Sequence, residues 1–163
     1  MNPIPSPQSP FAVIAIAAVA LGFATLSGPG CGTRPPKMSF QPATQGSLAA
    51  LRDTEFRLTH LIVDGTQVDT TAFPISLRFD ETGRVSGRSA VNRYFGGFSL
   101  GENGSLTWPP AGLGMTRMAG PEPAMQLEKT FTEVLTGSTR LLTSPTGARF
   151  ENDDGRRIAE FSK

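Results

Sequence analysis

Residues 75–89 read ISLRFDETGRVSGRS, and this stretch decides the fold class. Ile75, Leu77 and Phe79 alternate with polar residues, which is the pattern of a strand that buries one of its two faces. Residues 80–83 (DETG) predict a tight turn into a second strand. The stretch therefore predicts a β-hairpin, and an antiparallel sheet around it.

Further short strands with local turns are predicted on both sides of this hairpin. They cover residues 54–63, 92–100, 105–108, 139–143, 148–151 and 157–161. The connections between most of them are too short for the crossovers that parallel strands need. We therefore expect a small antiparallel β-meander or a barrel-like sheet.

One segment breaks the two-residue period. Residues 121–136 place their apolar side chains on one face of a helix, with Pro121 and Glu122 in its first turn and Gly137 just past its end. The apolar residues are Ala124, Leu127, Phe131, Val134 and Leu135. The predicted fold class is thus α+β, a β-rich sheet with one packed amphipathic helix over about residues 121–136.

The beginning of the chain has a different composition. Residues 11–26 (FAVIAIAAVALGFATL) carry no charge, and as a helix they would be about 24 Å long, which is short of the roughly 30 Å hydrocarbon core of a membrane. Such a run is typical of a signal peptide, although no Lys or Arg precedes it. We predict a signal peptide over residues 1–30.

Cys31 is the only cysteine, and it directly follows the small residues of SGPG. This position predicts lipidation of Cys31 after cleavage, although a typical lipobox has Leu three residues earlier and no Pro. The alternative is a chance cysteine in a secretion signal. Residues 31–47 then predict a flexible linker rich in Pro, Gly, Thr and Ser, and residues 48–163 the folded domain.

Charge and composition exclude several classes of site. The net charge of +1 argues against a nucleic-acid partner, which needs a basic face. His60 is the only histidine and has no partner motif, so we expect an ordinary residue of an edge strand. Asp153 and Asp154 lack the remaining ligands of a calcium loop and predict a hairpin turn. We expect no metal and no cofactor.

Two strings in the domain resemble the META domain family, also called HslJ-like. Residues 84–97 read RVSGRSAVNRYFGG and residues 116–128 read TRMAGPEPAMQLE. The matching positions are Gly87, Asn92, Arg93, Tyr94, Gly96, Thr116, Arg117, Met118, Ala119, Met125 and Glu128. The resemblance covers roughly residues 53–161. It implies an envelope protein, often a lipoprotein, with links to envelope stress and antibiotic tolerance.

The departures from the family pattern are also informative. Many family members have Cys where this chain has Val91 and again where it has Gly120. The resemblance implies that the two cysteines pair where both are present, which would explain their joint absence here.

The hallmark polar residues form the candidate site: Asn92, Arg93, Tyr94, Thr116, Arg117 and Glu128. One hypothesis is a pocket that binds a small anion or a peptide carboxylate through an arginine fork. The other, which we favour, is a structural network in which Glu128 pairs with Arg93 or Arg117 and holds the helix against the sheet. Tyr94 with Phe95 and Phe98 would form a ligand-stacking face or, as we expect, core packing.

The sequence thus predicts an exported, lipid-anchored, non-enzymatic protein of the cell envelope. Its partners would be a membrane, through the N-terminal lipid, and an envelope protein or small ligand. It would face the periplasm or the exterior. The alternative is a hydrolase that uses carboxylates such as Glu128 together with a neighbour.

Overall fold

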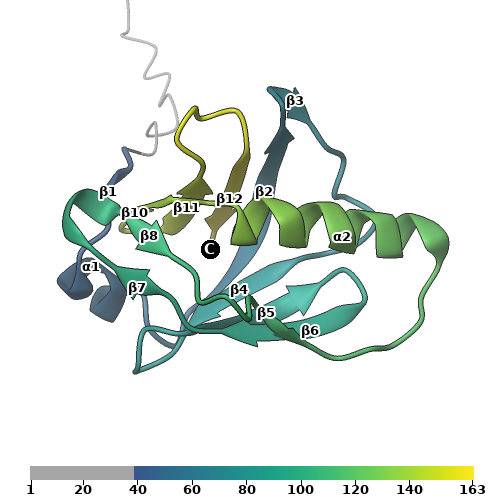
Figure 1. The fold of residues 1–163 in the computed structure, drawn as a ribbon, viewed down its shortest axis with the longest axis horizontal. Coiled ribbons are helices and arrows are strands. Elements are labelled where there is room, and N and C mark those ends of the chain that lie inside the picture. The colour runs from purple at the N-terminus through teal and green to yellow at the C-terminus, as the bar shows by residue number, and fades with distance from the viewer. Residues whose placement is uncertain (1–38) are drawn as a thin grey trace, which may run out of the picture. The chain divides into compact units, whose positions relative to one another are not determined.

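The computed structural model describes residues 39–163 (Figure 1). The predicted signal peptide and the candidate lipidation site, Cys31, lie outside the described residues.

The domain is built on an antiparallel sheet of ten strands, as the alternating pattern predicted. The strands are β1 (Gln41–Pro42), β2 (Glu55–Val63), β3 (Thr66–Gln67), β4 (Ser76–Phe79), β5 (Val85–Ser89), β6 (Asn92–Gly96), β9 (Gly114–Met115), β10 (Arg140–Ser144), β11 (Gly147–Glu151) and β12 (Ile158–Ser162). Their spatial order is β1-β10-β11-β12-β2-β4-β5-β6-β9, and β3 pairs with β2. A separate hairpin of β7 (Ser99–Leu100) and β8 (Leu106–Thr107) encloses the short helix η1 (Glu102–Gly104).

The sheet consists of two runs of consecutive strands joined at the middle. One run is β2, β4, β5, β6 and β9, the other is β10, β11 and β12, and β12 pairs with β2 to connect them. In this central pair Leu61 lies opposite Ala159 and Leu58 opposite Phe161, with a register shift at Glu160. The helix α2 (Glu122–Thr136) carries the chain from β9, at one end of the sheet, to β10, near the other.

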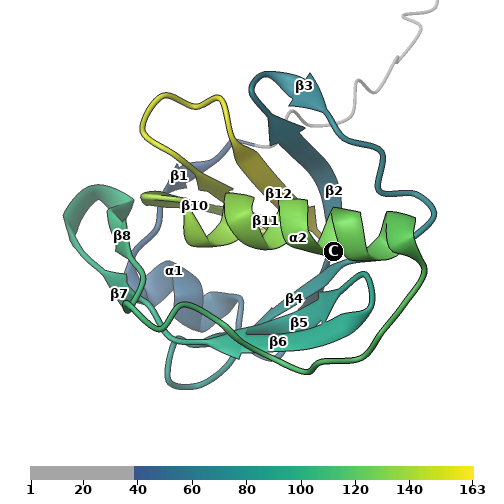
Figure 2. The same cartoon turned by 45° about the vertical axis from the view of Figure 1, so that its right-hand side comes forward.

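Helix α2 lies along the inner side of the curved sheet, as the two views show (Figures 1 and 2). It contacts β5, β11 and β12. Its apolar stripe is buried, and the Phe131 ring lies 5.5 Å from the Tyr94 ring and 6.2 Å from the Phe161 ring, measured between centroids. These rings stabilise the helix on the sheet by removing apolar surface from water. The predicted helix and fold class are confirmed.

The folded unit begins before residue 48. Strand β1 pairs with β10, and α1 (Gln45–Ala50) follows with a capping box in which the Thr44 hydroxyl accepts from the Ser47 N–H at 3.1 Å. Ala43 and Leu48 are buried in the core. The segment predicted as a linker, residues 31–47, is therefore folded from strand β1 onward, and the prediction is wrong for that part. The prediction failed because the Thr and Ser residues that cap a helix here are also typical of flexible linkers.

The position of His60 also differs from the prediction. Strand β2 is central and not at an edge, because β12 and β4 flank it. The His60 side chain is exposed, and its Nδ1 lies 3.6 Å from Glu160 Oε1 across the β2–β12 pair.

Candidate functional site

Glu128 is buried on the side of α2 that faces the β5–β6 hairpin, with 7 % of its surface exposed. Its Oε2 accepts hydrogen bonds from the Asn92 N–H at 2.7 Å, the Ser89 hydroxyl at 2.9 Å and the Val91 N–H at 3.3 Å. Its Oε1 accepts from Asn92 Nδ2 at 2.8 Å. Every partner is a neutral donor, and together they satisfy both carboxylate oxygens without an opposing charge.

The β5–β6 turn presents these donors because of its backbone conformation. Ser89 pairs with Asn92, and Ala90, between them, has φ 64°, which an alanine rarely adopts. This conformation persists only where its surroundings hold it. The Glu128 carboxylate, bound to both N–H groups at the end of the turn, is such a restraint.

The Asn92 side chain joins three parts of the fold, and it is 2 % exposed. Besides donating to Glu128, its Nδ2 donates to the Met118 carbonyl at 3.2 Å. Its Oδ1 accepts from the Thr116 hydroxyl at 2.8 Å and from the Met118 N–H at 2.7 Å. All four hydrogen-bonding positions of the amide are used. The segment after β9, strand β6 and helix α2 are therefore connected through one residue.

The predicted ion pair between Glu128 and an arginine is wrong. Neither Arg93 nor Arg117 makes a salt bridge within residues 39–163. Arg93 directly follows Asn92 in β6, and successive side chains of a strand point to opposite faces, so Arg93 is exposed on the outer face. Arg117 is exposed in the segment after β9. The helix is held by amide, hydroxyl and backbone donors instead.

Tyr94 belongs to the core, as expected, whereas the core packing expected for Phe95 is wrong, because its side chain is exposed. Its hydroxyl donates to the Ser76 carbonyl at 2.8 Å, and burial raises the pKa of the Tyr94 phenol. Gly87 lies opposite Tyr94, and a Cβ at Gly87 would overlap the Ser76 carbonyl oxygen. This glycine is needed because the backbones approach each other closely there.

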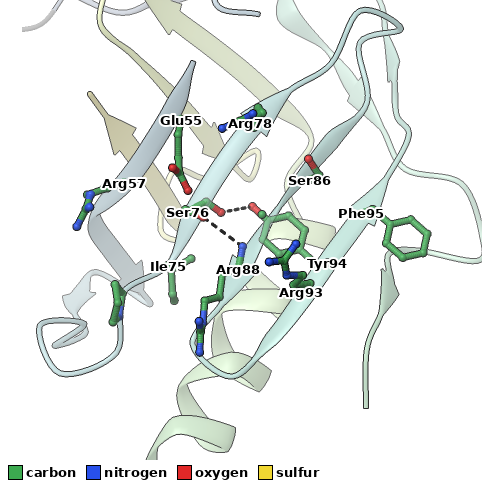
Figure 3. A pocket seen from close by; sticks show the side chains of 12 residues that line it. Glu55, Arg57, Ile75, Ser76, Arg78, Ser86, Arg88, Arg93, Tyr94 and Phe95 are labelled. Atoms are coloured by element: carbon green, nitrogen blue, oxygen red, sulfur yellow. Dashed lines mark hydrogen bonds between the residues drawn. The ribbon is translucent and has the colours of Figure 1, made fainter. Parts of the chain in front are cut away.

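The outer face of β2, β4, β5 and β6 carries an open hollow of about 720 Å³ (Figure 3). Its lining includes the arginines Arg57, Arg78, Arg88 and Arg93, the carboxylate Glu55, the hydroxyl residues Ser76 and Ser86, and the aromatic residue Phe95. We call these side chains the arginine face. Four cations against one carboxylate give the face a formal charge of +3 (4 − 1). A second, smaller hollow of about 160 Å³ adjoins it and shares Arg88 and Arg93.

The strand register orders the arginine face in rows. Arg88 lies directly opposite Arg93, and in the next row Glu55 lies opposite Arg78, Arg78 opposite Ser86 and Ser86 opposite Phe95. None of the four arginines makes a salt bridge within the part of the chain that the structure describes.

Three of the four arginines were not singled out from the sequence. Only Arg93 was, because it belongs to a hallmark string. The signal was nevertheless present: the four predicted strands within residues 54–100 each carry an arginine at an outward position of their alternation. What alternation alone does not give is the order of strands that brings the four side chains together.

Two other kinds of feature are absent from residues 39–163. No group of three or more His, Cys, Asp or Glu side chains in this range is arranged to hold a metal ion. No helix in the same range is both long and apolar enough to cross a membrane.

Comparisons with known proteins agree with this architecture. The META domain family model matches residues 49–163. A protein from Burkholderia xenovorans solved by NMR is 27 % identical, with a TM-score of 0.57 over 77 % of this chain and 92 % of its own. A second NMR structure is also 27 % identical, with a TM-score of 0.51 over 71 % of this chain and 92 % of its own. None of the curated proteins matches.

Proposed function

The chain belongs to the META domain family, and we propose that it is an exported, lipid-anchored, non-enzymatic protein of the cell envelope. In this proposal it binds a protein or small ligand through the arginine face. The links to envelope stress and antibiotic tolerance that the family resemblance implies form part of the same proposal.

One observation carries the binding proposal: the two faces of the β5–β6 hairpin are used differently. On the inner face, Asn92 and Glu128 satisfy each other and the surrounding backbone, which leaves them little capacity for a ligand. On the outer face, the arginines around the hollow have no ion-pair partner in residues 39–163. Unpaired guanidinium groups are available to a ligand.

The export proposal is supported by the sequence of the first 31 residues. An uncharged run at residues 11–26 precedes a break of small residues, and the only cysteine of the chain follows at once. In this proposal a peptidase removes residues 1–30, and the lipid on Cys31 then holds the domain at the surface of a membrane.

The hydrolase alternative finds less support in the geometry. Carboxylate-based hydrolysis needs two carboxyl groups that converge on a cavity. Glu128 lines neither hollow described above, and the larger hollow has a single carboxylate, Glu55.

An NMR titration would test the binding site. The full chain, labelled with ¹⁵N in neutral detergent, is titrated with the small-molecule fraction of a bacterial envelope extract. Amide shifts should concentrate on the outer residues of β4, β5 and β6, and extract components should keep their masses. Shifts centred on Glu128, accompanied by a reaction product, would replace this proposal with the hydrolase.

Mass spectrometry of the protein recovered from membranes would test the anchor. The expected mature chain begins at Cys31 and carries a lipid mass on that residue. A Cys31→Ala variant should leave the membrane fraction, whereas Ser39→Ala, a similarly small change after the cleavage site, should stay. An unmodified Cys31 thiol in membrane-bound protein would contradict the anchor.

A further inference from the structure

Arg88 and Arg93 are neighbours on the arginine face, and their placement is unfavourable without a ligand. They lie directly opposite each other on β5 and β6, where like charges destabilise a strand pair. Arg88 Nε donates to the Ala90 carbonyl at 3.3 Å, and neither side chain has a carboxylate partner in residues 39–163.

Arg149, on another strand of the same sheet, is an arginine whose charge is neutralised within the protein. It lies opposite Glu160 on β12, and its Nε and NH2 donate to Glu160 Oε2 at 2.9 and 2.6 Å. The Phe40 ring covers its guanidinium at 4.6 Å. Arg88 and Arg93 lack this kind of neutralisation, so their guanidinium groups are available to bind an anion.

The dimensions of the face indicate how many anionic groups a ligand should carry. The four arginines stand on four neighbouring strands, which at about 4.8 Å per strand spread over roughly 14 Å. A single oxyanion reaches only part of that width. The hollow of about 720 Å³ is in the range of pockets that bind small organic molecules.

Phe95 adds an apolar contact at one end of the face. Its side chain is 53 % exposed, and it lies across Gly114 of β9, where a Cβ would come within 2.6 Å of the ring. Figure 3 shows the ring at the side of the face, away from Arg57 and Arg88. A sugar or other ring of a ligand would have an apolar surface to contact there.

We propose that the arginine face binds a small ligand with two or more oxyanion groups, phosphates or carboxylates, and that Arg88 and Arg93 clamp one of them. The inference rests on the proposed binding function and names the chemistry of the ligand. A guanidinium fork matches both kinds of oxyanion, so the two sources are distinguished by experiment.

Isothermal titration of the full chain in neutral detergent tests the clamp with two probes, fructose 1,6-bisphosphate and citrate. At least one should bind, more tightly than inorganic phosphate and more weakly as salt rises. The Arg88→Gln/Arg93→Gln variant should lose at least tenfold in affinity, and its melting temperature should equal or exceed that of the parent because the repulsion is gone. The probe that binds more tightly identifies the source.

Arg117→Gln is the matched control, because it removes a charge from an exposed arginine that lines neither hollow. It should bind as the parent does. Equal weakening by Arg117→Gln would show attraction by net charge only and would overturn the clamp. The absence of binding by both probes would also overturn it, and the extract titration would still show separately whether the face binds something else.

Discussion

The two faces of strand β6 differ in how their side chains are used. We call them the inner region and the outer region. Asn92 and Tyr94 point inward and have their polar groups bonded within the protein, while Arg93 and Phe95, one position further on in each case, point outward and are exposed. The inner region joins helix to sheet, and the outer region leaves its charges open to solvent. Neighbouring hallmark residues of one string thus serve different purposes, so the string should not be read as one site.

The two faces should also contribute differently to the free energy of unfolding. Buried hydrogen-bonding groups destabilise strongly when a partner is removed, because the other group stays buried and unpaired. Exposed charges contribute little, and opposed like charges are unfavourable. Stability should therefore respond to changes on the inner face and binding to changes on the outer face.

A second carboxylate at position 92 should have the largest effect. Asn92→Asp places a second carboxylate against Glu128 Oε1, where the amide now donates at 2.8 Å, and should lower the free energy of unfolding by roughly 3–5 kcal/mol. Glu128→Gln should also destabilise, because its amide group faces donors in either orientation. The double variant restores a donor opposite an acceptor and should recover part of the loss in chemical denaturation.

Arg93→Ala provides the contrast for this cycle, since it changes the residue next to Asn92 on the outer face. Its unfolding free energy should stay within about 0.5 kcal/mol of the parent. A loss as large as that of Asn92→Asp would show that the two faces are not separate. Additive losses in the Asn92–Glu128 cycle would show that the hydrogen bond does not couple them.

A disulfide between positions 91 and 120 should have the next largest effect, in the opposite direction. A Cβ at Gly120 would lie 3.4 Å from the Val91 Cβ, close to the separation across a disulfide. Oxidised Val91→Cys/Gly120→Cys closes a loop of roughly 30 residues and should gain about 3 kcal/mol. The reduced form serves as the control, and a melting temperature that does not rise on oxidation would contradict the proposed proximity.

Gly87→Ala tests the backbone between the two regions and should have the smallest of these effects. The added methyl group overlaps the Ser76 carbonyl, which accepts from the Tyr94 hydroxyl, so the strands must separate at a loss of about 1–3 kcal/mol. At Gly97 the nearest atom to a Cβ is an arginine side-chain carbon at 3.8 Å. Gly97→Ala should melt close to the parent, and equal melting of both variants would contradict the close approach at Gly87.

The sequence predicted those parts of the fold that carry a periodic pattern. Alternation at residues 75–79 and the apolar stripe of residues 121–136 correspond to β4 and α2. Strand β9 is only Gly114–Met115 in a run rich in Gly and Pro, so no period could reveal it. Helix α1 was hidden in a polar segment because its cap uses the residues typical of linkers.

The candidate site was predictable only in its composition. Position along α2 places Glu128 beside the apolar stripe, which predicts burial, and it is buried. Its partners include the backbone N–H groups of Val91 and Asn92, and every residue has an N–H, so a sequence cannot show which ones converge. A charged partner was expected because a sequence shows which side chains are charged but does not show where the backbone places its N–H groups.

The pairing of β12 with β2 has a consequence for the order in which the domain can fold. Thr59 donates to the Glu160 carbonyl across 101 positions of sequence, so the central pair closes a loop that spans most of the domain. Pairing over such distances is slow, because the entropy of loop closure is lost before the contacts form. A chain made from its N-terminus lacks the middle of its sheet until β12 has been synthesised. Until then one edge of β2 has no partner strand, and the polypeptide remains accessible to proteins that act on unfolded chains.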